Sequence, residues 1–235
     1  MMLYLTKSRR NNQVKQSGKK RFAMYETICS PLNYGGLVLK NRVIFAPTSM
    51  GLPQEEQAAY LKRLAAGGVA MIIVGDVPVL PSRFGPSLYS KKGFAYYKAL
   101  ADAVHSEGGK ICAQLHQSDS DLKAMLKYIP GVLTKRISME ELRPLLNQQV
   151  GPYITGLPVE KIHRITEAFG TAAELAVKAG FDMVQVHGDR MCGSFSSSVF
   201  NHRTDAYGGS ATDRARFAVE AVSAVRRRLP NLPID

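Results

Sequence analysis

The chain has 235 residues, of which 45% are hydrophobic, so it can bury a sizeable core within one domain. It has no run of about 20 apolar residues that would cross a membrane and no secretory signal core. Its three cysteines, Cys29, Cys112 and Cys192, lie far apart and lack metal-ligand spacing. We therefore expect a cytoplasmic protein with no metal site and no membrane partner.

The net charge of +12 is concentrated at one end of the chain. Residues 1–24 hold seven Lys or Arg side chains and no acidic one, which leaves +5 for the remainder. This segment is polar and lacks apolar periodicity, so we predict a basic, disordered extension ahead of a folded part at 25–235. Because it also lacks interleaved aromatic residues, we do not expect a nucleic-acid partner.

From residue 25 onward, patterns typical of strands alternate with patterns typical of helices. In chain order the predicted elements are a strand at 42–47, a helix at 54–68, a strand at 69–75, a helix at 94–109, a strand at 110–115, a helix at 158–179, a strand at 181–186 and a helix that starts at a capping box of Ser210 and Asp213. Residues 128–156 are expected to be irregular apart from a short helix at 139–146. The final "LPID" reads as the start of a fifth strand.

Four βα units in series imply a parallel sheet covered by helices, which is either doubly wound or a (β/α)8 TIM barrel. A doubly wound sheet usually carries a glycine-rich GxGxxG turn after its first strand. This chain has "APTSMGLP" at that point, which favours the barrel. Since a complete barrel needs about 250 residues, the chain supplies about the first four βα units and the start of the fifth strand.

Polar side chains directly follow the predicted strand at 181–186. In "VHGDRMCGSF", residues 186–195, the side chains of His187, Arg190 and Cys192 come within six residues of one another. TIM-barrel active sites lie at the C-terminal ends of the strands, so this position indicates a site. Taken alone, a histidine such as His187 is more often a satisfied core or loop residue than a site residue.

Strand parity adds neighbours to this candidate site. Alternate residues of a strand share a face, so Gln185 and His187 point the same way, into the barrel. The same parity places Cys112 and Gln114 on one face near the end of the predicted strand at 110–115. The "PTS" sequence at 47–49 ends the first strand in the same region, which strengthens the interpretation as a site.

Five segments together resemble the old yellow enzyme family, in that family's order. They are "PLNYGGLVLKNRVIFAPTSMG" (31–51), "GGVAMIIVGD" (67–76), "GGKICAQLH" (108–116), "AGFDMVQVHG" (179–188) and "FNHRTDAYGGSATDRARFAVEAVSAVR" (200–226). The last block is highly specific, whereas each shorter match is weak by itself. The resemblance covers about residues 25–235, and the branch it resembles most is that of the bacterial NADH:flavin oxidoreductases and enoate or 2,4-dienoyl-CoA reductases.

The resemblance implies an FMN-dependent ene reductase. Such an enzyme takes hydride from NAD(P)H and transfers it through the flavin to a small-molecule unsaturated carbonyl or enoate substrate. By motif position, the residues implied to contact FMN are Ala46, Pro47, Thr48 and Ser49 at the first strand, Gly75 at the second and Gln114 at the third.

The resemblance also assigns roles at the fourth strand, where many members read His-Gly-Ala-His-Gly-Tyr. There the two histidines hold the substrate carbonyl oxygen and the tyrosine donates a proton. By position these roles fall to His187, Arg190 and Cys192, so the last two depart from the pattern. Arg190 is a permanent cation and favours anionic substrates. Cys192 is either an acid or a small packing residue, and both interpretations stay open.

The remaining motifs concern structure rather than chemistry. In "NHRTDAYGGS" we expect Asn201, Arg203 and Asp205 to lock the loop and cap the next helix rather than touch substrate.

The family's phosphate-binding loops, and any iron–sulfur cluster, would belong to a further C-terminal part. One alternative is therefore a non-catalytic half-barrel that does not hold FMN alone. A flavin-free aldolase-type barrel is disfavoured because no strand end offers a lysine.

Overall fold

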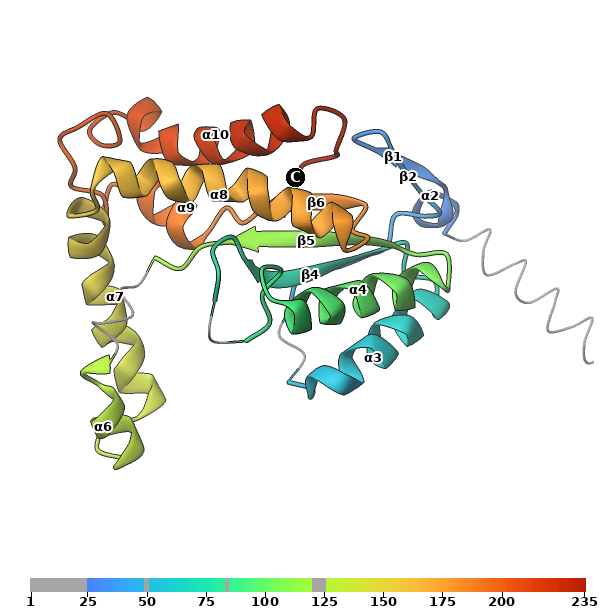
Figure 1. The fold of residues 1–235 in the computed structure, drawn as a ribbon, viewed down its shortest axis with the longest axis horizontal. Helices are drawn as coiled ribbons and strands as arrows, with labels where there is room; N and C mark the ends of the chain where they lie inside the picture. The colour runs from blue at the N-terminus through green and yellow to red at the C-terminus, as the bar shows by residue number, and fades with distance from the viewer. Residues whose placement is uncertain (1–24, 49–50, 83–84, 120–125) are drawn as a thin grey trace, which may run out of the picture.

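The computed structural model describes residues 25–48, 51–82, 85–119 and 126–235 (Figure 1). Its main sheet has four parallel strands in the order β3–β4–β5–β6. These strands are β3 (Ile44–Phe45), β4 (Met71–Pro78), β5 (Lys110–His116) and β6 (Met183–Val186). Each strand lies beside its predecessor in the chain, as in a TIM barrel, whereas a doubly wound sheet reverses direction at a switch point. The predicted basic extension at 1–24 lies outside the described residues.

The helices of the sheet units lie where the sequence predicts them. They are α3 (Gln54–Ala66), α4 (Lys91–His105), α8 (Val159–Lys178) and α10 (Ala211–Arg228). α10 begins at the predicted cap, where the Ser210 hydroxyl accepts a hydrogen bond from the Asp213 amide at 3.1 Å. Figure 1 shows α8 and α10 side by side along one part of the sheet and α3 and α4 along another.

The segment at 128–156 is more helical than expected, although the predicted helix at 139–146 forms and starts at Met139. The structure has a short helix α6 (Ile129–Leu133) and a long helix α7 (Met139–Thr155) there, which extend away from the sheet in Figure 1. Pro144 and Pro152 lie inside α7, where an interior proline removes a backbone hydrogen bond and is unfavourable. The N-terminus of α7 is nonetheless stabilised by a capping box, in which the side chains of Ser138 and Glu141 each accept a hydrogen bond from the other's backbone amide.

Three further elements were not predicted: α2 (Glu26–Cys29), a hairpin of β1 (Leu32–Tyr34) and β2 (Leu37–Leu39), and α9 (Arg190–Ser196). They are short and carry little periodic signal. The hairpin lies beside the end of the sheet where the strands begin (Figure 1). Its residues Leu32, Tyr34 and Leu37 pack on a small apolar cluster, so the hairpin covers that end of the barrel interior.

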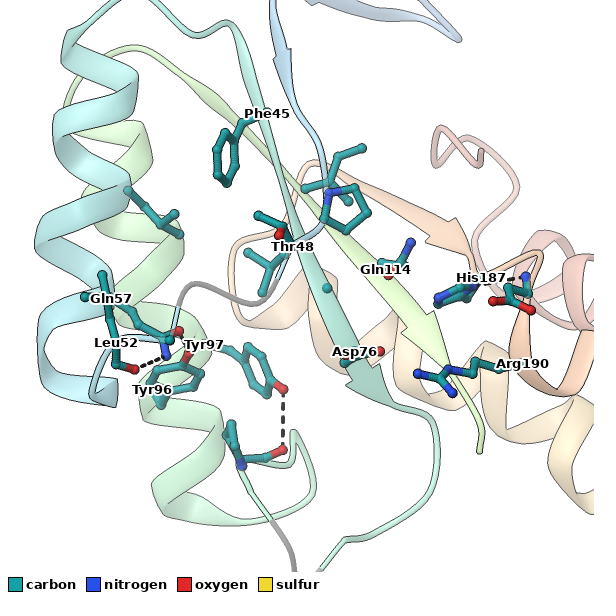
Figure 2. Close-up of a pocket in the computed structure, with 18 residues that line it drawn as sticks. Phe45, Thr48, Leu52, Gln57, Asp76, Tyr96, Tyr97, Gln114, His187 and Arg190 are labelled. Atoms are coloured by element: carbon teal, nitrogen blue, oxygen red, sulfur yellow. Dashed lines mark hydrogen bonds between the residues drawn. The ribbon is translucent and has the colours of Figure 1, made fainter. Parts of the chain in front are cut away.

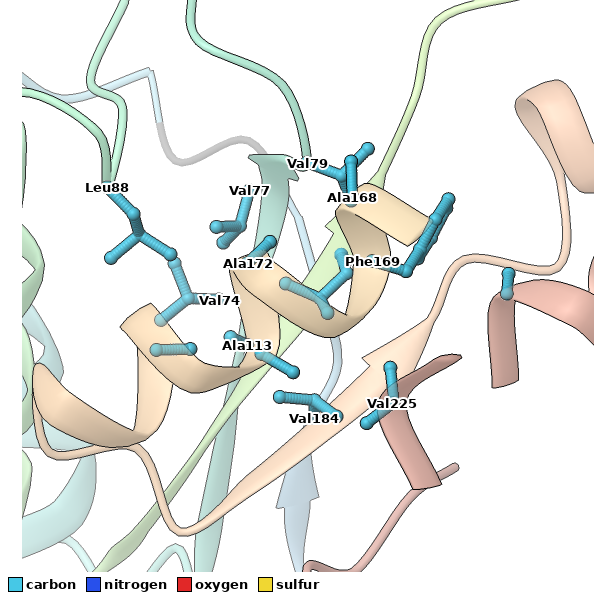
Figure 3. Close-up of a cluster of buried hydrophobic side chains, with 14 of the residues drawn as sticks. Val74, Val77, Val79, Leu88, Ala113, Ala168, Phe169, Ala172, Val184 and Val225 are labelled. Carbon is cyan, nitrogen blue, oxygen red and sulfur yellow. The ribbon is translucent and has the colours of Figure 1, made fainter. Parts of the chain in front are cut away.

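The two faces of the sheet bury different side chains, as strand alternation requires. One face packs on the helices: Figure 3 shows Val74, Ala113 and Val184 from three strands meeting Ala172 and Phe169 of α8. The opposite face carries the barrel-interior cluster, which consists of Leu39, Ala70, Met71, Ile73, Cys112 and Met183. This second face leads to the C-terminal ends of the strands and therefore positions the candidate site.

The last residues confirm the predicted start of a fifth strand. Ile234 forms a parallel bridge with Val184 of β6. The Val186 amide donates a hydrogen bond to the Asp235 carbonyl at 2.8 Å, and the Asp235 amide donates to the Val184 carbonyl at 3.1 Å. By strand parity, Asp235 then lies on the barrel-interior face, since Ile234 packs against the helix-side core.

The loop at 201–207 is held by its own polar side chains, as predicted, whereas the cap of α10 is Ser210 and none of these residues. The Asn201 amide donates hydrogen bonds to the carbonyls of Phe195 and Tyr207, at 2.6 and 2.7 Å. Arg203 is buried and forms an ion pair with Asp205. Its guanidinium also donates to backbone carbonyls at the end of α7, so it joins this loop to the neighbouring helix.

Candidate active site

A cavity of about 470 Å³ opens at the C-terminal ends of the strands (Figure 2). The strand ends contribute Phe45, Pro47, Thr48, Ile73, Val74, Gly75, Asp76, Gln114, His187, Asp189 and Arg190 to its lining, and the helices α3 and α4 contribute Gln57, Leu61, Tyr96 and Tyr97. This volume lies within the range of roughly 300–1,000 Å³ that is usual for small-molecule sites. Polar and apolar side chains contribute to the lining in similar measure, so the cavity can hold a ligand that has both kinds of surface.

Most of the residues predicted to contact FMN line this cavity. Pro47, Thr48, Gly75 and Gln114 are all part of its wall. Ala46 is exposed and is not among the lining residues. Ser49 lies outside the described residues. The structure therefore brings together four of the six positions that the resemblance implied.

Gly75 is the point at which two strand ends approach most closely in the cavity wall. A Cβ atom added there would lie 3.2 Å from the Cβ of Pro47 and 3.5 Å from Oε1 of Gln114. A larger side chain would therefore fill the space between them, whereas glycine leaves the backbone open to the cavity. A wall formed by Gly75 and Pro47 with the Gln114 amide at its edge leaves room for a planar heteroaromatic ring such as the flavin of FMN.

Asp76 lines the cavity because of an irregularity in β4. The pairing of β4 with β5 shifts register between Val74 and Val77, and Asp76 adopts a left-handed φ of 55°. A bulge of this kind redirects a side chain at the end of a strand. The sequence analysis missed Asp76, although an acidic residue directly after the apolar run "VAMIIVG" was the available signal.

Two histidines lie together at the ends of β5 and β6. The strands pair Cys112 with Met183 and Gln114 with Gln185, so the next inward pair is His116 and His187. Their ring centroids are 6.3 Å apart. His116 was missed as a site residue, but the parity that joins Cys112 to Gln114 reaches it two residues later.

One hydrogen bond determines which ring nitrogen of a neutral His187 carries the proton. Nδ1 of His187 accepts a hydrogen bond from the Asp189 amide at 3.1 Å, so the neutral ring carries its proton on Nε2 and can donate there. Burial lowers the pKa of His116, with Asp76 opposing this effect and His187 and Arg190 adding to it. Among the described residues, Nδ1 of His116 is a buried polar atom with no hydrogen-bond partner.

Arg190 brings a permanent positive charge to this group. It is the first residue of α9, adopts a left-handed φ of 52° and lines the cavity. In Figure 2 its guanidinium and the Asp76 carboxylate point toward one another, with His187 nearby. The cavity mouth therefore combines a cationic donor with the Nε2–H of His187, an arrangement suited to an anionic oxygen.

The structure does not bring Cys192 into this group. Its side chain is 3% exposed, packs in the helix-side core and is not among the lining residues. Burial raises the pKa of the Cys192 thiol to about 12. These surroundings favour the interpretation of Cys192 as a packing residue over that of an acid. No group of three or more His, Cys, Asp or Glu side chains within the described ranges could hold a metal ion.

No helix in the described part of the chain is long and apolar enough to cross a membrane. Comparison with known proteins identifies relatives that match almost all of the described part of this chain. The profile of the NADH:flavin oxidoreductase / NADH oxidase family matches residues 27–231. The bilirubin reductase of Clostridium symbiosum (strain WAL-14163) is 60% identical over 213 residues, which cover 90% of this chain and 57% of that protein.

A second bilirubin reductase, from Mediterraneibacter gnavus (strain CC55_001C), is 34% identical over 215 residues, which cover 88% of this chain and 33% of that protein. The solved structure of Old Yellow Enzyme from Pichia sp. AKU4542 superimposes with a TM-score of 0.71 at 23% identity, and covers 88% of this chain and 58% of that one. The chain thus has the fold of a TIM barrel of this type and spans about half of it or less.

Proposed function

The chain belongs to the NADH:flavin oxidoreductase / NADH oxidase family, and we propose that it is the N-terminal, site-bearing half of an FMN-dependent ene reductase that uses NAD(P)H. FMN, when bound, supplies the hydride chemistry between NAD(P)H and a conjugated carbon–carbon double bond. Pro47, Thr48 and Gly75 would hold the flat ring, and Gln114 would hydrogen-bond its edge. Their joint position on one cavity wall supports this assignment.

His187 and Arg190 are proposed to bind the substrate carbonyl oxygen. Hydride addition at the β-carbon of an unsaturated carbonyl places negative charge on that oxygen, which preorganised donors stabilise. In comparable sites each donor contributes about 2.7–4 kcal/mol. The Nε2–H of His187 and the guanidinium of Arg190 supply two such donors at the cavity mouth.

The observation that carries the substrate proposal is Arg190 in the cavity wall beside His187. Because its guanidinium has several N–H donors and a permanent charge, Arg190 can bind the carbonyl oxygen and also attract a carboxylate of the same substrate. The relative at 60% identity is a bilirubin reductase, and bilirubin is a linear tetrapyrrole with conjugated carbonyl groups and two propionate groups. We propose bilirubin, or a closely similar anionic conjugated compound, as the substrate of the full-length protein.

The test compares bilirubin with its dimethyl ester in steady-state kinetics on full-length enzyme. Arg190→His should reduce the preference for the free acid by about 10- to 100-fold in kcat/KM, the worth of one charge-assisted hydrogen bond. His187→Ala is the matched control and should slow both substrates equally. An unchanged ratio of the two kcat/KM values in Arg190→His would refute the selective role of Arg190.

A second candidate concerns these 235 residues by themselves. The chain covers 57% of the length of the bilirubin reductase that it resembles at 60% identity, and the phosphate-binding loops of such barrels follow the later strands. We propose as the alternative that the chain alone is a non-catalytic half-barrel that does not retain FMN. The proposals on cofactor and substrate therefore refer to the full-length protein.

A further inference from the structure

Four polar side chains form a hydrogen-bonded line across the barrel interior, beneath the cavity. Gln114 Nε2 donates to Gln185 Oε1 at 2.8 Å, and Gln185 Nε2 donates to Asp235 Oδ2. The Tyr34 hydroxyl donates to the other carboxylate oxygen, Asp235 Oδ1, at 2.7 Å. The line therefore joins β5, β6, the start of the fifth strand and the β1–β2 hairpin, which are distant in sequence.

The direction of every hydrogen bond in this line follows from the carboxylate at its far end. An ionised carboxylate only accepts hydrogen bonds, so Gln185 must turn its NH2 group toward Asp235. Its carbonyl oxygen then faces Gln114, which in turn must donate through Nε2. Tyr34 is a donor for the same reason, and its hydrogen bond to Asp235 raises the pKa of the Tyr34 hydroxyl to about 12.

The consequence appears at the cavity wall. Because Gln114 uses Nε2 within the line, its Oε1 atom is directed to the other side. That oxygen lies 3.5 Å from the position of a Cβ atom on Gly75, which is itself part of the cavity wall. The cavity therefore presents a hydrogen-bond acceptor at this edge, and a complementary ligand must place a donor there.

We propose that Asp235, acting through Gln185, fixes the orientation of the Gln114 amide and thereby selects a ligand that carries an N–H group beside Gly75. The identity of that ligand rests on the proposed function. The oxidised flavin ring of FMN has one N–H group, the imide at N3, and it is the group that this acceptor fits. Asp235 and Gln185 are positioning residues, while Gln114 is the residue that contacts the ring.

An asparagine at position 235 tests this directional argument at nearly constant shape. The asparagine amide can either donate or accept, so Gln185 and Gln114 are free to adopt both orientations. Gln185→Met is a second variant, which interrupts the line with a side chain of similar size and leaves Asp235 in place. Tyr34→Phe is the matched control, because it removes one hydrogen bond of the carboxylate and retains the acceptor that orients Gln185.

The experiment uses full-length apoprotein reconstituted with FMN. The dissociation constant of FMN is measured by fluorescence quenching, and the ionisation of the bound N3–H is followed by the visible spectrum as the pH is raised. In the wild type the acceptor should hold the N3 proton, so N3–H ionises at higher pH than in free FMN. Asp235→Asn and Gln185→Met should each increase the N3 acid dissociation constant and the dissociation constant of FMN by about two- to tenfold, as expected for one neutral hydrogen bond.

The outcomes separate this inference from the proposed function. If the wild-type full-length protein binds no FMN, the proposed function fails. If it binds FMN but Asp235→Asn and Gln185→Met leave both the N3 ionisation and the dissociation constant unchanged, the positioning role of Asp235 is refuted. Tyr34→Phe should match the wild type in N3 ionisation; a change equal to that in Asp235→Asn would also contradict the argument.

Discussion

Replacement of Arg203 by alanine should lower the free energy of unfolding more than the replacement of any exposed residue on the surface of α10. The Arg203 side chain is 6% exposed. Its Nη1 atom donates to the carbonyls of Ile154 and Leu157 at 2.8 and 2.6 Å, and its Nε atom donates to Asp205 at 2.9 Å. Arg203 thus provides donors for the carbonyls of Ile154 and Leu157, at and just beyond the C-terminus of α7.

The magnitude follows from what Arg203→Ala leaves behind. Each carbonyl that loses its donor in a buried position costs about 1–3 kcal/mol. The ion pair with Asp205 adds about 1 kcal/mol or less, because the Asp205 side chain is 37% exposed and stays solvated when Arg203 is removed. These effects overlap because one guanidinium supplies all of them, so we expect the free energy of unfolding to fall by about 3–5 kcal/mol. Arg203→Lys should lose about half as much, since an ammonium retains the charge without the planar set of donors.

The assay is urea denaturation followed by circular dichroism. Arg227→Ala is the control: Arg227 pairs with Glu167, but both side chains are more than half exposed. Such surface pairs contribute about 0–1 kcal/mol, so this variant should unfold close to the wild-type midpoint. The reasoning would be wrong if Arg203→Ala lost less than about 1 kcal/mol, or no more than Arg227→Ala.

Two further predictions concern groups that the structure places away from the cavity. Burial alone would raise the pKa of Asp182, but hydrogen bonds from His105, Lys110 and the Ile111 amide leave it below the ordinary value of 3.8. The ionised Asp182 therefore stabilises the folded state fully above pH 3.8, and this stabilisation is lost as the pH falls through the pKa that Asp182 has in the folded state. Asp182→Asn should accordingly lower Tm at about pH 7 more than at about pH 3. Equal losses of Tm at both pH values would contradict this. Cys192→Ala should leave kcat/KM for bilirubin within about twofold and reduce stability by about 1 kcal/mol, because the thiol is buried with a raised pKa. A tenfold or greater loss of kcat with intact folding would instead support an acid role.

Periodicity and motif order in the sequence determined the βα units and the family. The strands at 69–75 and 110–115 and the helix at 158–179 are long or apolar enough for local pattern to identify them. The resemblance placed Gly75, Gln114, His187 and Arg190, which all line one cavity. By contrast, only the first part of α7 was predicted, and its continuation through Pro152, which is unfavourable locally, is tolerated within the folded structure.

Only the tertiary structure decided which side chains meet and which way they point. A bulge between Val74 and Val77 turns Asp76 to the cavity, and register between β5 and β6 places His116 beside His187. The packing of α9 buries Cys192, which a position-by-position comparison had aligned with an acid. The orientation of Gln114 depends on Asp235, 121 positions later in the chain. Contacts of this kind arise from strand pairing and helix packing between distant segments, and no local sequence pattern encodes them.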